Sequence, residues 1–168
     1  MSTRAPFLPI AAAAAAVALI ATADASSAET VDLSALGWRW PVDTVQVVEP
    51  FAAPAHAYGP GHRGVDLVWD GGAVRAPSGG IIAFAGPVAG RGVVTIDHGG
   101  GLVTTLEPVE PRATIGSVVF GGDIVAAQGE GGHTPPGVLH FGVRLDGNYI
   151  NPMLLLGGVP RAVLLPCC

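Results

Sequence analysis

Two histidines and one aspartate, in two stretches far apart in the sequence, are the side chains best suited to chemistry. His62 and Asp66 stand four positions apart in GHRGVDL, residues 61–67, and His140 lies in LHFGV, residues 139–143. Positions separated by an even number share a face of an extended segment, so one strand can present both His62 and Asp66. Two imidazoles and one carboxylate form a sensible ligand set for Zn²⁺ and leave its fourth position open.

This ligand set indicates hydrolytic chemistry. A zinc ion with an open position polarises a carbonyl and lowers the pKa of bound water towards ~7. The alternative is that each histidine is a structural residue of the interior, with its hydrogen bonds satisfied by neighbouring groups.

The elements that position these residues are predicted to be short strands joined by turns. Of 168 residues, 25 are Gly and 15 are Pro, and both types disfavour helix interiors. No 3.6-residue periodicity follows the N-terminal segment, so we expect an all-β fold, an antiparallel β-sandwich or a partly open barrel. The loop at residues 51–61, rich in Pro, Ala and Gly, is predicted to deliver His62. Strands are predicted at residues 38–42, 45–48, 65–68, 81–85, 93–96, 102–106, 118–120, 124–127 and 138–145.

The N-terminal residues 1–25, MSTRAPFLPIAAAAAAVALIATADA, have the pattern of a secretory signal peptide. Arg4 gives a positive start, an apolar stretch follows at residues 5–21, and small residues at 21–25 provide cleavage sites. The alternative is a retained membrane anchor, because the apolar stretch approaches the ~18 residues that span a bilayer. We therefore predict a secreted, extracytoplasmic protein that contacts a membrane only where this segment is retained.

Charge and residue usage exclude several classes of function. The net charge of −5 gives no electrostatic reason to expect nucleic acid, which needs a basic face. All eight basic residues are Arg, and the absence of Lys excludes Schiff-base chemistry and attachment of biotinyl or lipoyl groups. Cys167 and Cys168 are adjacent, which suits neither a metal clamp nor an unstrained disulfide. We interpret them as a feature of the tail, with an intermolecular disulfide as the alternative.

Five stretches together resemble the lysostaphin-type (LytM-like) zinc metallopeptidases, a family of peptidoglycan endopeptidases. Their order and spacing match that family over about residues 58–157. The resemblance implies an antiparallel β fold with a narrow groove, and a Zn²⁺ at its floor held by His62, Asp66 and His140. It also implies the peptide portion of peptidoglycan as substrate. The stretches are GHRGVDL, VRAPSGGIIAFAG, VVTIDHGGGLVTT, GGDIVAAQG and LHFGVRLDGNYINPMLLL.

The sequence departs from the family at two positions where proton carriers are expected. The family has HxH at the last motif, and here the first of these histidines is replaced by Val138. A second catalytic histidine is replaced by Pro108 in TTLEP, residues 104–108. General acid–base assistance typically contributes ~10²–10⁴-fold to a rate, so their loss matters.

Another side chain is therefore needed to carry the proton. We predict His133, in the Gly/Pro loop GEGGHTPPGVLH, because imidazole titrates near ~6.5. Glu107 and Glu130 are other candidates, and the alternative for His133 is an exposed loop residue. We interpret His98 as structural and His56 as solvent-facing.

Two functional hypotheses remain open from the sequence. In the first, the chain is an exported zinc endopeptidase that acts on peptide crosslinks of cell-wall peptidoglycan. In the second, it is a catalytically degenerate module that binds wall peptide or regulates a cell-wall amidase. The predicted organisation is a signal peptide at 1–25, a linker at 26–37, a lysostaphin-type domain at 38–160 and a tail at 161–168.

Overall fold

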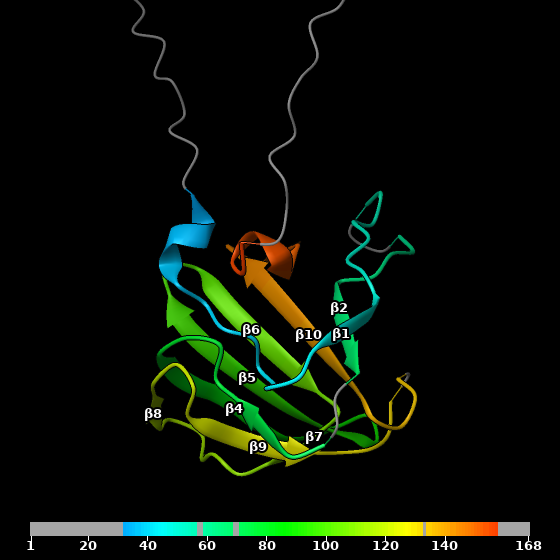
Figure 1. The fold of residues 1–168 in the computed structure, drawn as a ribbon. Coiled ribbons are helices and arrows are strands. Elements are labelled where there is room, and N and C mark those ends of the chain that lie inside the picture. The colour runs from blue at the N-terminus through cyan, green and yellow to red at the C-terminus, as the bar shows by residue number, and fades with distance from the viewer. Residues whose placement is uncertain (1–31, 57–58, 69–70, 133, 158–168) are drawn as a thin grey trace, which may run out of the picture. The chain divides into compact units, whose positions relative to one another are not determined.

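Two antiparallel sheets make up the computed structural model, which describes residues 32–56, 59–68, 71–132 and 134–157 (Figure 1). The fold is all-β, and neither sheet closes into a barrel, as predicted. The strands are β1 Gln46–Glu49, β2 Gly64–Val68, β3 Ala73–Arg75, β4 Gly80–Val88, β5 Arg91–Gly99, β6 Leu102–Glu107, β7 Val109–Pro111, β8 Val118–Val119, β9 Ile124–Gln128, β10 Val138–Leu145 and β11 Asn148–Ile150, with short 3-10 helices η1 Leu33–Leu36 and η2 Pro152–Leu154.

The large sheet brings segments from both halves of the domain side by side. Its strand order is β1-β2-β10-β6-β5-β4-β8, and β11 pairs with β10 beyond the end of β2. The small sheet has the order β3-β9-β7. Figure 1 shows the small sheet lying across one face of the large one. The two predicted metal-binding stretches therefore fall on the neighbouring strands β2 and β10.

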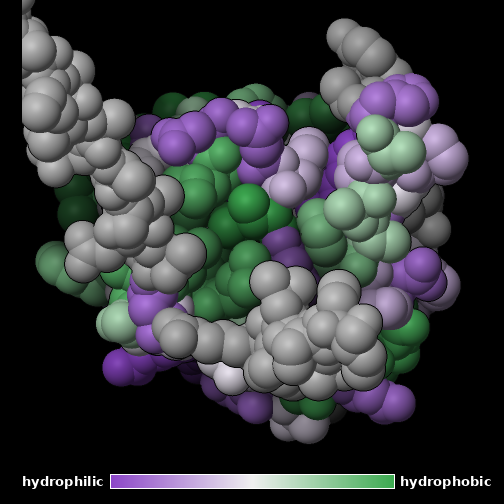
Figure 2. All heavy atoms as spheres, turned by 90° about the horizontal axis from the view of Figure 1, so that it is seen from above, coloured by the Kyte–Doolittle hydropathy of each residue, from purple (hydrophilic) through white to green (hydrophobic). Residues whose placement is uncertain are grey.

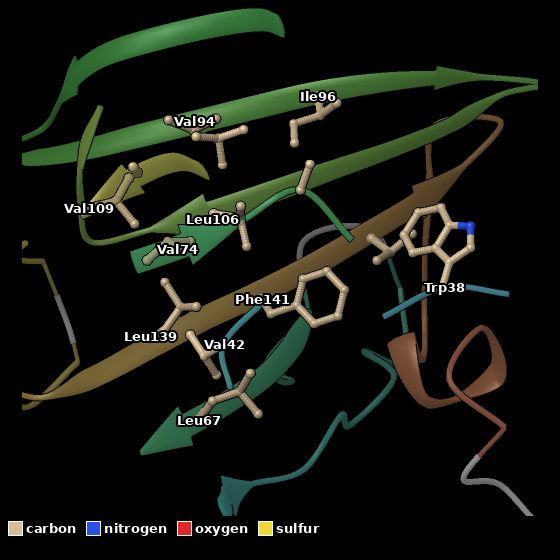
Figure 3. Packing of buried hydrophobic residues seen from close by; sticks show 14 of the residues in the cluster. Trp38, Val42, Leu67, Val74, Val94, Ile96, Leu106, Val109, Leu139 and Phe141 are labelled. Carbon is tan, nitrogen blue, oxygen red and sulfur yellow. The ribbon is translucent and has the colours of Figure 1, made fainter. Parts of the chain in front are cut away.

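Hydrophobic packing between the sheets gives each central strand one core face. On β10, Leu139, Phe141 and Val143 have no exposed surface. They pack with residues of the small sheet such as Val74 and Val109 (Figure 3). Because successive side chains of a strand alternate between faces, His140, Gly142 and Arg144 point away from this core. The opposite face of the large sheet is thus the one that carries polar residues.

Hydrophobic side chains also reach the surface. Figure 2 shows them (green) among hydrophilic residues (purple) at the end of the molecule seen from above.

Most of the predicted strands are confirmed, and several run longer than predicted. The prediction of a strand at residues 38–42 is wrong. This segment forms single backbone bonds, from the Arg39 N–H to the Pro77 carbonyl and from the Arg75 N–H to the Pro41 carbonyl, and belongs to no sheet. Pro41 has no N–H to donate, which prevents a continuous ladder.

Three short strands were not predicted. They are β3, then β7, which only Pro108 separates from β6, and β11, which follows the turn at Asp146 and Gly147.

The described residues belong to one compact unit, which begins at Asp32. The predicted signal peptide, His133, Cys167 and Cys168 lie outside the described residues. Among the described residues, no helix has the length and apolar character needed to cross a membrane.

Candidate metal centre

The three predicted ligands come together on the polar face of the large sheet. Asp66 lies on β2 directly opposite His140 on β10, so their side chains share a face. His62 lies just before β2. Within the part of the chain that the structure describes, this is the only group of three or more His, Cys, Asp or Glu side chains close enough to hold one ion.

The donor atoms of the three side chains are mutually close. The His62 Nε2 atom lies 3.0 Å from Asp66 Oδ1 and 3.2 Å from His140 Nδ1. The His140 Nδ1 atom lies 2.7 Å from Asp66 Oδ1. Ligands at 2.0–2.1 Å in a tetrahedral zinc site stand about 3.3 Å apart, so this triangle is close to the required size. The chemistry and the spacing of the donor set both fit Zn²⁺.

The ring of His62 is oriented by its other nitrogen. The His62 Nδ1–H donates to the carbonyl of Pro50 at 2.9 Å, which leaves the Nε2 lone pair directed at Asp66 and His140. A metal-ligating histidine commonly makes such a second hydrogen bond. The segment that includes Pro50 is held beside His62 by paired backbone bonds between Ala52 and His62, at 2.8 and 2.9 Å. This pairing fixes both the tautomer and the direction of the imidazole.

The prediction that one strand presents both His62 and Asp66 is wrong in detail. β2 begins at Gly64, and the chain bends at Arg63. His62 instead forms an isolated bridge with Ala52. The strand-face rule therefore places Asp66 and His140, whereas the loop at residues 50–61 places His62.

Gly64 makes room for the His140 ring. A Cβ atom on Gly64 would lie 2.5 Å from the carbonyl oxygen of Phe141 and 2.7 Å from His140 Nε2. Gly142, directly opposite Gly64, also lacks a side chain above the sheet. Two glycines therefore form the floor of the site beside His140.

Burial lowers the pKa of His140 below its usual value of 6.5, although hydrogen bonding to Asp66 and the charges of Asp66 and Glu107 oppose this effect. A lowered pKa favours the neutral imidazole, which is the form that binds a metal ion.

Glu107 lies on β6 directly opposite His140, so a second carboxylate shares this face. It is only 8% exposed, and its Oε1 atom lies 2.9 Å from Nη2 of Arg91 on β5. Sequence reasoning named Glu107 but missed Arg91, because residues on separate strands give no local signal. Three polar side chains thus form a row across neighbouring strands β2, β10 and β6, namely Asp66, His140 and Glu107. Arg91 forms an ion pair with the last of them.

The two positions at which the resemblance implies proton-carrying histidines hold apolar side chains in this protein. Val138 is 7% exposed and lies on β10 opposite Val68. Pro108 is also buried, directly after Glu107. Neither side chain can accept or donate a proton.

The remaining described histidines are not among the three side chains that form the centre. His98 is held by the Gly79 carbonyl at 2.8 Å and the Thr104 hydroxyl at 2.8 Å, and its ring contacts Trp38. These contacts agree with its interpretation as a structural residue. His56 is exposed.

Comparison with known proteins places this geometry in a family. Residues 60–152 match peptidase family M23. An uncharacterized protein of Mycobacterium tuberculosis is 37% identical over 136 residues, which cover 77% of this chain and 54% of that protein. The DD-carboxypeptidase/endopeptidase Mpg of Neisseria meningitidis is 31% identical over 94 residues, or 55% of this chain and 22% of Mpg. The chain thus spans about half the length of the mycobacterial relative.

The fold also matches solved structures. The solution structure of lysostaphin superimposes with a TM-score of 0.60 at 22% identity, covering 77% of this chain and 58% of that one. The matched family region contains His62, Asp66 and His140, and also Pro108 and Val138. The fold is that of lysostaphin, and by its sequence match over residues 60–152 the chain belongs to peptidase family M23, as a divergent member.

Proposed function

We propose that this protein is an exported zinc-dependent peptidase that acts on peptide crosslinks of bacterial cell-wall peptidoglycan. The observation that carries the proposal is the convergence of His62 Nε2, Asp66 Oδ1 and His140 Nδ1 within hydrogen-bonding distance of one another. Family M23 consists of metallopeptidases, and Mpg is named as a carboxypeptidase and endopeptidase. The signal-peptide pattern of residues 1–25 supports export to the compartment that contains this substrate.

The chain's own residues define what the site does around the ion. His62, Asp66 and His140 would hold a Zn²⁺ ion, which would supply Lewis-acid polarisation of a carbonyl and activation of water. Gly64 and Gly142 leave the sheet face beside His140 without side chains, so a peptide backbone can approach closely.

Among the described residues, Glu107 is the titratable side chain best placed to move a proton. It shares the face of His140, and Arg91 fixes its Oε1 atom. His133, which the sequence predicts for this role, remains a candidate. The absence of histidine at positions 108 and 138 leads us to expect slow turnover, because acid–base assistance typically contributes ~10²–10⁴-fold.

Hydrolysis of peptidoglycan fragments by the purified, zinc-loaded protein tests the proposal. We expect new amino termini to appear, and His140→Ala to abolish them. His56→Ala, which alters an exposed histidine outside the centre, is the matched control and is expected to retain wild-type activity. Fragments that stay intact with wild-type protein, or are cut equally by His140→Ala, contradict the proposal.

Metal content provides a test that does not depend on turnover. We expect elemental analysis to find about one zinc per chain in the wild type and far less in Asp66→Ala, because a ligand and its negative charge are lost. Equal zinc in both proteins would contradict the assignment of Asp66 as a ligand.

A second candidate function is a binding module for wall peptide or a regulator of a wall amidase. The observation that favours it is the burial of Val138 and Pro108 at the two positions of the family's proton carriers. It predicts that wild-type protein binds peptidoglycan without cutting it. It also predicts that Val138→His combined with Pro108→His creates hydrolysis.

A further inference from the structure

A second group of polar side chains lies on the same sheet face as the metal centre, farther along β10. Arg144 stands four residues after His140, so both side chains point to that face. On the neighbouring strand β11, Tyr149 lies directly opposite Arg144. Four residues of antiparallel strand span about 14 Å, so the group lies within the reach of a short extended peptide that starts at the ligands.

Two arginines contact the ring of Tyr149. The guanidinium carbon of Arg63 and that of Arg144 each lie 5.9 Å from the ring centroid. The two come from different elements: Arg63 is at the bend before β2, and Arg144 is near the end of β10. Tyr149 is 42% exposed, so the group is open to solvent. Two like charges beside one aromatic ring create a positive site in a protein whose net charge is −5.

Within the described residues Arg144 forms no salt bridge, whereas Arg75 and Arg91 both do. Its Nε atom is buried and has no hydrogen-bond acceptor in this part of the chain. Asp97 lies in the same cross-strand row, beyond Val103 of β6, but its carboxylate accepts the N–H of Gly99. An unmatched guanidinium of this kind prefers a carboxylate, which pairs with its planar donors in a bidentate fork.

The surface between the two sites suits an extended chain. Gly142 lies between His140 and Arg144 on this face, and Gly64 lies opposite Gly142. No side chain of these two residues separates the ligands from the arginines. A peptide that crosses this floor places its backbone near His140 and a later side chain or terminus near Arg144.

We propose that Arg144 and Arg63, arranged around Tyr149, bind a carboxylate of the peptide substrate about four residues or fewer from the metal centre. The inference rests on the proposed function, and it adds that the substrate class is an acidic peptide. Arg144 is the principal contact, and Arg63 adds charge from the loop that also delivers His62. The site fixes the position of the peptide along the sheet and takes no part in bond cleavage.

Calorimetric titration of the zinc-loaded full chain tests this proposal. The probes are a disaccharide tetrapeptide purified from peptidoglycan and the same compound after conversion of its carboxylates to amides. A charge-assisted hydrogen bond contributes about 1.5–3 kcal/mol, so we expect wild-type protein to bind the acid form ~10–100-fold more tightly. In Arg144→Gln the preference is expected to fall to within about 2-fold, and Arg144→Lys to give an intermediate value because lysine lacks the fork.

Arg112→Gln is the matched control, because it removes one positive charge from an exposed residue of the loop after β7. We expect this variant to keep the wild-type preference. Should Arg144→Gln fail to fold, Arg63→Gln replaces it, with an expected loss of preference of ~3-fold or more. Equal binding of acid and amide by wild type, no binding of either, or equal losses in Arg144→Gln and Arg112→Gln would each overturn the proposal.

This titration measures binding and not turnover, so the peptidase function and the carboxylate site can fail independently of each other. A preference for the acid form that depends on Arg144, without hydrolysis, removes the peptidase function and leaves the carboxylate site. Hydrolysis by a wild-type protein that binds the acid and amide forms equally supports the peptidase function and removes the carboxylate site.

Discussion

Gly64 shows at the scale of one residue how a missing side chain shapes the centre. Its Cβ would meet the Phe141 carbonyl oxygen at 2.5 Å, which is backbone and cannot swing aside, and the His140 ring at 2.7 Å. We expect Gly64→Ala to lower the free energy of unfolding by about 1–3 kcal/mol and to weaken zinc binding, because the ring must shift. Urea denaturation and zinc titration measure both effects.

Gly79 provides the control for this substitution. A Cβ there would have its nearest contact at 3.5 Å, from the Val119 carbonyl oxygen, which is an ordinary distance. Gly79→Ala is therefore expected to leave zinc affinity unchanged. A Gly64→Ala protein that binds zinc like the wild type would show that the His140 ring tolerates displacement.

Arg91 and Glu107 form a second residue-scale feature. Their side chains are only 22% and 10% exposed, and the pair joins β5 to β6 beside His140. Arg91→Met leaves the Glu107 carboxylate buried without its partner, so we expect a loss of about 1–3 kcal/mol of stability in urea denaturation. Adding Glu107→Gln to Arg91→Met should recover part of that loss. If the double variant is no more stable than Arg91→Met, the unpaired charge is not the cause.

At the scale of elements, the sequence predicted strands well where apolar residues recur and poorly where they do not. The bounds of β10, residues 138–145, are those predicted, because apolar side chains alternate along it between turn residues. β3, β7 and β11 have only three residues each, too few for a periodic pattern. Pairing with longer neighbours creates these strands, and single-sequence patterns do not contain that information.

The same contrast explains which parts of the site were predictable. Asp66 and His140 follow from alternation on two strands, once the strands are neighbours. The orientation of His62 depends on the Pro50 carbonyl, and the charge of Glu107 is matched by Arg91. Both contacts join separate elements, as does the arginine pair at Tyr149. The residue types that carry the chemistry could be identified from the sequence, whereas the residues that orient them could be identified only from the folded structure.

His98 links elements and gives the fold a dependence on pH. It joins β5 to the turn at Gly79 and to Thr104 on β6, and burial lowers its pKa below 6.5. The unfolded chain therefore binds more protons, and stability falls as pH decreases from about 6.5 through the lowered folded-state pKa. His98→Gln should reduce this slope by up to ~1.4 kcal/mol per pH unit. Denaturation between pH 5 and 7.5 measures it, and an unchanged slope would contradict the role of His98.

For the whole molecule, zinc is expected to act as a stabilising ligand. An ion that binds only the folded state at about 100 times its Kd adds about 2.7 kcal/mol, which raises Tm by several degrees. Differential scanning calorimetry with zinc and with a chelator should show this shift in wild type and in His56→Ala, and not in Asp66→Ala. A shift that persists in Asp66→Ala would place the bound ion elsewhere.

Buried apolar residues and site-facing residues alternate along β10, and this alternation limits how the strand can change during evolution. Odd-numbered positions from Leu139 to Val143 fill the interior, and even-numbered positions from His140 to Arg144 carry the chemistry. Inserting or deleting one codon inside this strand would exchange the two sets, turning the imidazole inward and the phenyl ring of Phe141 outward. Length variation among homologues should therefore be absent from residues 138–145 and should collect in the hairpins that border them.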